Sequence, residues 1–143
     1  MTNEANLSES IIFARGEVNP PPFNQYFTGV CYVNELVSFD SPLGCLVSNV
    51  TFEPRCRNNW HTHTGGQILL VTGGRGWYQE EGKPARALHR GDVVEILPHV
   101  KHWHGAAADS WFVHVAIESD LTGGPPVWFE PVRDDEYNQL ESA

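Results

Sequence analysis

Residues 60–74 read WHTHTGGQILLVTGG, and residues 91–107 read GDVVEILPHVKHWHGAA. Each stretch holds two histidines separated by one residue, next to a short apolar run that is bounded by glycine. Side chains alternate between the two faces of a β-strand, so residues two apart lie on the same face. The two stretches therefore predict strands that each present a pair of imidazoles on one side.

The first pair, His61 and His63, shares its odd-numbered register with Gln67. If one strand continues through all three positions, two ring nitrogens and one amide oxygen converge. The second histidine pair supplies further imidazole. We therefore predict one divalent metal ion at this place. Imidazole nitrogen combined with a carbonyl oxygen suits Mn, Fe, Ni, Co or Zn and is unusual for Ca or Mg.

Strand patterns dominate the middle of the chain. Short apolar or alternating runs recur about every ten residues, which is typical of an all-β sandwich or barrel. Glycine-containing turns are expected at 73–74, 81–83 and 90–92. The expected strands are Tyr26–Leu36, Cys45–Phe52, Gln67–Thr72, Gly76–Gln79, Ala85–Leu88, Val93–Leu97 and Trp111–Ile117.

The two ends of the chain have a different character. We divide the chain into an N-terminal arm at 1–25, a barrel at 26–132 and a C-terminal tail at 133–143. Three successive prolines, at 20–22, predict an extended arm that can lie across a partner subunit. Residues 133–140 are compatible with a short helix in which Asp134 is the N-cap. We expect a homodimer or a higher homo-oligomer that associates through the N-terminal strands.

The composition is that of one soluble domain. The chain has 143 residues, of which 41% are hydrophobic and 19% charged. A net charge of −9 argues against a nucleic-acid partner. Its three cysteines form no Cys-x-x-Cys pair, as in a protein with reduced thiols. Without a signal-peptide pattern or an apolar run of the ~20 residues that span a bilayer, we expect a cytoplasmic protein without a membrane partner.

The histidine stretches resemble the two signature motifs of the cupin superfamily, over Leu46 to Ile117. The resemblance implies a single-domain jelly-roll β-barrel and a metal held by His61, His63, Gln67 and His102. This sequence departs from the motifs at several positions. Gln67 replaces the usual glutamate, and the usual glycines, proline and asparagine are replaced by Arg55, His99, Leu97 and Ala106.

A closer resemblance is to the small bacterial cupins that include the manganese-dependent hydroxynitrile lyases. The runs that carry it are 50–54, 60–63, 91–94 and 101–107. Those proteins also use glutamine as the fourth ligand and carry a histidine at the position of His114. The resemblance implies manganese as the ion and a lyase that acts on a small-molecule carbonyl adduct.

Gln67 also bears on the expected chemistry. Three imidazoles and an amide leave a divalent ion with its full charge, which favours Lewis-acid work on a carbonyl or hydroxyl oxygen. A trivalent state is harder to reach than with a carboxylate ligand. Lyase or hydration chemistry is therefore expected before oxygen activation. A cupin dioxygenase or isomerase, and a binding protein without activity, are the alternatives.

Three further residues are candidates for catalysis. His104 and His114 can act as the base, because neutral imidazole accepts a proton near pH 7. Glu118 has the strand parity of His114 and can position it or titrate beside the substrate. A core role for His114 and a surface role for His104 are the alternatives. Ser48 and Val50 are expected at the mouth of the pocket, and Phe52, Trp60, Trp77 and Trp103 in or near its wall; His89 and His99 are expected to be structural or at the surface.

Overall fold

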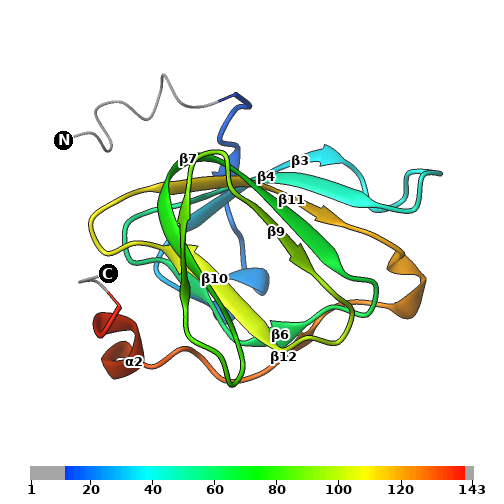
Figure 1. The fold of residues 1–143 in the computed structure, drawn as a ribbon. Coiled ribbons are helices and arrows are strands. Elements are labelled where there is room, and N and C mark those ends of the chain that lie inside the picture. Colours follow the sequence, from blue (N-terminus) through cyan, green and yellow to red (C-terminus); the bar gives the residue numbers. More distant parts are fainter. Residues whose placement is uncertain (1–11, 141–143) are drawn as a thin grey trace.

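The computed structural model describes residues 12–140, and its strands alternate between buried and exposed side chains. Such alternation belongs to a sheet with one face on a core. The strands curl into the all-β barrel that the sequence predicts (Figure 1). They are β1 (Glu17–Val18), β2 (Phe27–Thr28), β3 (Cys31–Val37), β4 (Leu46–Phe52), β5 (Arg57–Asn58), β6 (His61–Thr62), β7 (Gln67–Glu80), β8 (Arg86–His89), β9 (Val93–Ile96), β10 (His102–Ala106), β11 (Phe112–Glu118) and β12 (Val127–Trp128).

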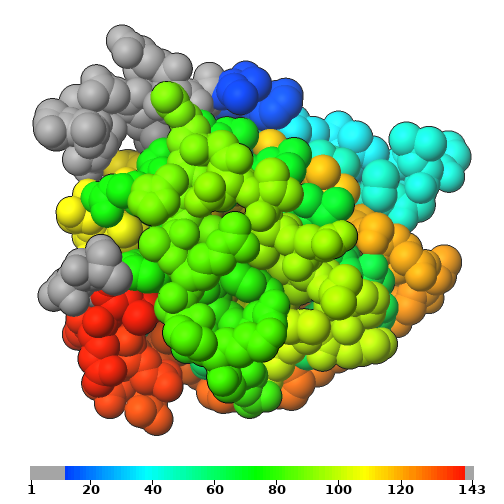
Figure 2. Space-filling view, viewed as in Figure 1, coloured from blue at the N-terminus to red at the C-terminus, as the bar shows by residue number. Residues whose placement is uncertain are grey.

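The sheet follows the order β1-β3-β4-β11-β7-β10-β5-β2, and all its pairings are antiparallel. β11 lies between β4 and β7, so that His114 has Val50 on one side and Val71 on the other. β10 pairs with β7 along its whole length and also meets β6. The segment around β8 and β9 covers the middle of the face seen in Figure 2. The chain thereby brings β4, β6, β7, β10 and β11 around one interior.

The turn predicted at Gly73-Gly74 is wrong, because β7 continues through these residues without reversing direction. Gly74 has a φ of 70°, and a Cβ there would overlap the carbonyl oxygen of Trp111. The neighbouring ladder with β11 shifts register between Val113 and His114. The strand therefore bends here instead of reversing, and one half pairs with β9 while the other pairs with β8. The turns predicted around Gly82 and Gly91 are confirmed.

The three prolines predict an extended N-terminal arm, but the arm is only partly extended. β1 pairs with β3, and the chain then turns, with the N–H of Asn24 donating to the carbonyl of Pro20 at 3.1 Å. A short 3₁₀ helix, η1 (Phe23–Tyr26), follows and leads into β2. The arm is thus folded against the barrel. The outer parts of the predicted arm and tail, at 1–11 and 141–143, lie outside the described residues.

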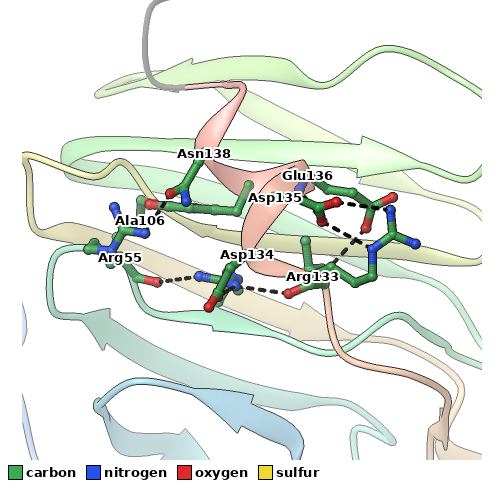
Figure 3. A network of polar contacts seen from close by, with 10 residues as sticks. Arg55, Ala106, Arg133, Asp134, Asp135, Glu136 and Asn138 are labelled. Carbon is green, nitrogen blue, oxygen red and sulfur yellow. Dashed lines mark hydrogen bonds and ion pairs between the residues drawn. The ribbon is translucent and has the colours of Figure 1, made fainter.

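The predicted C-terminal helix is confirmed as α2 (Asp134–Asn138), which lies at the side of the barrel (Figures 1 and 2). Its N-cap is Arg133 rather than Asp134. The N–H of Arg133 donates to the carboxylate of Glu136 (Figure 3), whereas the carboxylate of Asp134 accepts from Arg57 at 2.7 Å. Asp134 is therefore drawn away from the backbone by a buried guanidinium. A second 3₁₀ helix, η2 (Leu121–Gly123), precedes β12.

Two apolar clusters fill the molecule. The larger one lies inside the barrel and includes Phe52, Leu69 and Phe112. The smaller one packs under α2 and consists of Trp60, Trp77, Trp103, Val132 and Tyr137. Within residues 12–140, no helix is long and apolar enough to cross a membrane.

Tyr137 joins α2 to the barrel, because its buried hydroxyl donates to the carbonyl of Ala106 at 2.6 Å. We predict that Tyr137→Phe lowers the free energy of unfolding by about 1–3 kcal/mol, since a buried acceptor loses its donor. Urea denaturation measures this change. Asp135→Asn, on the exposed face of α2, is the control. An unchanged free energy of unfolding in Tyr137→Phe would contradict the role of this contact.

Candidate metal centre

One end of the barrel is hollowed into a cavity of about 500 Å³, within the usual size of a small-molecule site. Ser48 and Val50 line it, as predicted from their place on β4. The predicted site residues that also line it are His61, His63, Gln67, His104, His114 and Glu118. His102 is fully buried next to them, with its ring centre 4.2 Å from that of His61.

Pairing between β6 and β10 sets this arrangement, because it places His61 directly opposite His102. The strand register predicted to run from His61 to Gln67 is nevertheless interrupted. β6 ends at Thr62, the chain passes through Gly66 with a φ of 86°, and β7 begins at Gln67. A turn, rather than one continuous strand, therefore brings Gln67 to the same cavity as His61 and His63.

The ring orientations of two histidines are fixed by backbone carbonyls. Nδ1–H of His61 donates to the carbonyl of Asn59 at 2.8 Å, and Nδ1–H of His102 donates to that of Val100 at 2.9 Å. Each ring therefore has the lone pair of Nε2 free. Second-sphere hydrogen bonds of this kind are what orient imidazoles toward a metal ion.

Several buried donor atoms lack a hydrogen-bond partner in the part of the chain that the structure describes. They include both ring nitrogens of His63, Nε2 of His102 and Oε1 of Gln67. Buried polar atoms in folded proteins nearly always have a partner, so an unpaired group of this kind calls for a ligand. Imidazole nitrogens with an amide oxygen fit a divalent transition metal, as the sequence predicts.

Burial keeps four histidines of this region neutral, namely His61, His102, His104 and His114. It lowers the pKa of His102 to about 4 and the pKa of His114 to about 3, from an ordinary value of 6.5. Burial, reinforced by neighbouring histidines, also lowers the pKa of His61 and of His104 well below the ordinary range. Neutral imidazole is the form that binds metals and accepts protons, and it prevails here at pH 7.

The ligand atoms of His61, His102 and His104 all lie within 4.8 Å of one another. Three histidines could therefore hold an ion here. The ring of His63 is also close, 4.9 Å from His61 and 5.4 Å from His102 between centres. His104, which we predicted to be a base, is therefore also placed where it could bind the ion. The ligand set of His61, His63, Gln67 and His102 stays a prediction.

The two candidate bases form one buried unit, with ring centres 4.9 Å apart and perpendicular planes. Phe52 packs against both rings. Nδ2 of Asn58 lies 3.3 Å from Nε2 and 3.4 Å from Nδ1 of His104. Among the described residues, neither ring nitrogen of His114 has a hydrogen-bond partner. Both imidazoles line the cavity and are available to a bound molecule.

Glu118 lines the cavity as expected, but among the described residues it makes no hydrogen bond to His114, one of the two partners considered for it. Its Oε2 lies 2.6 Å from Nδ1 of His63. The reason is its place at the end of β11, opposite Gln67, whereas His114 lies deeper in the strand, opposite Val71. The carboxylate therefore reaches the segment between β6 and β7.

The aromatic wall differs from the prediction. Trp60, Trp77 and Trp103 belong to the cluster under α2, since Trp103 points to the opposite face of β10 from His102. Phe52 does line the cavity. The sequence analysis did not predict Trp128 as a wall residue. Its ring stacks on that of Tyr26 with 4.5 Å between ring centres and lies 4.6 Å from the ring centre of His61. Its strand has two residues, too few for a periodic pattern.

The structure is that of a small protein with a curled, barrel-like β-sheet and three histidines that could hold a metal ion. The model of the Cupin domain family matches residues 48–117. Over 114 residues the chain is 43% identical to (R)-mandelonitrile lyase from Granulicella tundricola, covering 80% of this chain and 87% of that protein. The chain belongs to the cupin superfamily, as its motifs implied.

Solved structures agree with this assignment. A cupin-like protein from Thermotoga maritima is 47% identical, with a TM-score of 0.85 over 90% of this chain and 96% of that one. A DMSP lyase from Ruegeria pomeroyi shares the fold, with a TM-score of 0.62 at 20% identity over 87% of this chain and 62% of that one.

The lowered pKa values predict how stability depends on pH. Between about 3 and 6.5, the unfolded chain protonates His114 while the folded chain does not, so stability falls as the pH falls through this window. We expect His114→Gln to reduce the slope of unfolding free energy against pH by about 1.4 kcal/mol per pH unit. Urea denaturation of metal-free protein at a series of pH values measures the slope. The matched control is His89→Gln at the surface, and an equal slope in His114→Gln and wild type would rule out the buried neutral imidazole.

Proposed function

We propose that this protein is a metal-dependent lyase that splits a small carbonyl adduct, with α-hydroxynitriles as the substrate class. The observation that carries the proposal is the cluster of buried, neutral imidazoles facing an apolar cavity. The similarity to (R)-mandelonitrile lyase supports the same chemistry.

The ion that we propose is manganese, or another divalent transition metal, held by His61, His63, Gln67 and His102. The fixed tautomers of His61 and His102 and the unpartnered oxygen of Gln67 support this set. When bound, the ion supplies Lewis-acid polarisation of a hydroxyl or carbonyl oxygen. The remaining tasks fall to the side chains of the cavity.

The first of these tasks is proton transfer. In cleavage, a neutral imidazole takes the proton of the substrate hydroxyl, a C=O double bond forms, and the bond to the nitrile carbon breaks with its electron pair. The resulting imidazolium returns the proton to cyanide, giving hydrogen cyanide and a carbonyl product. We propose His104 for this step, since its ligand atom lies within 4.8 Å of those of His61 and His102, and His114 as its neighbour in the same buried unit.

The second task is to hold the substrate away from water. Phe27, Phe52 and Trp128 give the cavity aromatic walls, and the imidazoles lie among them. A molecule with an aromatic ring at one end and a hydroxyl at the other matches this distribution. Mandelonitrile has that form and suits a cavity of about 500 Å³.

We predict that protein loaded with Mn²⁺ cleaves mandelonitrile to benzaldehyde. The variant His102→Ala lacks a central imidazole, so it should neither retain the ion nor cleave mandelonitrile. Benzaldehyde absorbance measures the rate, and elemental analysis measures the metal. Equal rates in the two proteins would refute the proposal. If the protein consumes oxygen in the presence of a catechol and forms no benzaldehyde from mandelonitrile, it is a dioxygenase instead.

The base is tested separately. We expect His104→Gln to keep its metal and to lose about 10²–10⁴-fold in kcat, the usual contribution of a general base. His114→Gln, measured beside it, shows how much the neighbouring ring contributes. If His104→Gln loses the ion together with the activity, His104 is a ligand and the assignment as base fails.

We also propose a cytoplasmic homodimer that associates through the N-terminal strands. The three cysteines are free thiols, which suits a reducing compartment. β1 ends the strand order of the sheet, and Val18 on it is exposed, so a second copy could cover this edge. Light scattering should give about twice the 16.0 kDa of one chain. A mass equal to one chain would contradict the dimer.

A further inference from the structure

Three of the four predicted metal ligands are histidines, and the Nδ1 atom of each has a neighbour that can accept its proton. For His61 and His102 the neighbour is a backbone carbonyl. For His63 it is a carboxylate: Oε2 of Glu118 lies 2.6 Å from Nδ1, within ion-pair distance, although Nδ1 makes no hydrogen bond among the described residues. With Nδ1 protonated toward the acceptor, Nε2 of each ring presents its lone pair.

We infer that Glu118 is the positioning residue of the metal centre: it holds His63 in the ligating tautomer and supplies the negative charge that the ligands lack. The inference rests on the metal site of the proposed function. It differs from the catalytic role expected from the sequence, because Glu118 acts here through His63 and not on the substrate.

The contact is built into the fold. His63 is buried, and the side chain of Glu118 is only 16% exposed. Glu118 ends β11 directly opposite Gln67, the first residue of β7, so the carboxylate and the predicted amide ligand lie at the same rim of the cavity. Nε2 of His63 is buried and, among residues 12–140, without a hydrogen-bond partner, which leaves it for a ligand.

The charges in the cavity point the same way. Three imidazoles and an amide carry no charge, so an ion bound by them keeps its full positive charge. Within the described chain, Glu118 is the one carboxylate that lines the cavity, and its lining contains neither lysine nor arginine. Other acids near the barrel are engaged elsewhere, as Glu53 is with Tyr32 and Glu80 with Lys83.

A carboxylate placed behind an imidazole has two effects on a metal ion. It makes the imidazole a stronger donor, and it offsets part of the charge of the ion. The carboxylate of Glu118 would have both effects without occupying a coordination position on the ion. A glutamate at position 67 would add its charge only by coordinating the ion directly. The positions that a substrate oxygen needs therefore stay open.

The test is a titration of metal-free protein with Mn²⁺ alone, without substrate, followed by calorimetry or by competition with a fluorescent chelator. We expect Glu118→Gln to weaken the affinity by about 10–100-fold, the usual cost of losing such a partner. Glu95→Gln, on the exposed side of β9, removes one carboxylate elsewhere and should leave the affinity unchanged. An affinity of Glu118→Gln within twofold of wild type overturns the inference.

A second measurement asks whether the effect passes through His63. In a His63→Ala background, Glu118→Gln should cause a clearly smaller loss of affinity, because the ring that it positions is gone and only its through-space charge effect remains. The same loss in both backgrounds overturns the positioning role. Glu118→Asp keeps the charge on a shorter side chain and should recover part of the affinity, which also guards against a variant that merely folds poorly.

The outcomes separate this inference from the proposed function. If wild type binds Mn²⁺, Glu118→Gln binds it weakly and mandelonitrile is not cleaved, then the positioning role holds and the lyase proposal falls. If mandelonitrile is cleaved while Glu118→Gln binds Mn²⁺ like wild type, the lyase proposal holds and the positioning role falls. A wild type that binds no Mn²⁺ overturns both.

Discussion

The antiparallel pairing of β6 with β10 is the contact on which the rest of the site depends. It sets His61 opposite His102 and brings their ring centres to 4.2 Å. Two protonated rings at this distance would repel each other, so the arrangement requires the neutral form, and burial supplies it by lowering both pKa values. The barrel is thus organised around a group of buried, uncharged imidazoles.

The sequence predicted this part of the site because it depends on short-range periodicity. Alternation along β10 sends His102 and His104 to the cavity side and Trp103 to the cluster under α2. His99 and Arg55 stand where cupin motifs have glycine, and both keep the left-handed backbone, with φ of 68° and 75°. The backbone N–H of Arg55 donates to the carbonyl of Ala107, which helps to offset the strain of that conformation.

The features that the sequence missed all depend on where distant segments meet. Gly73-Gly74 reads as a turn, and only the approach of Trp111 explains why β7 bends there instead. Trp128 reaches His61 because β12 pairs with β6, a contact between residues far apart in the chain. Glu118 shares a strand with His114, but strand parity says nothing about the turn that carries His63 to its carboxylate.

The separation of Glu118 from position 67 divides two tasks that a single glutamate ligand would combine. A glutamate at 67 would neutralise charge and occupy the ion at once. In the proposed centre the amide of Gln67 would take the coordinating position at the start of β7, and the carboxylate of Glu118 lies opposite it at the end of β11. Since the carboxylate would act through the ring of His63, its charge would reach a bound ion weakened by distance. Such a centre would keep more Lewis acidity than a carboxylate-ligated one, with ligands that are still oriented by their partners.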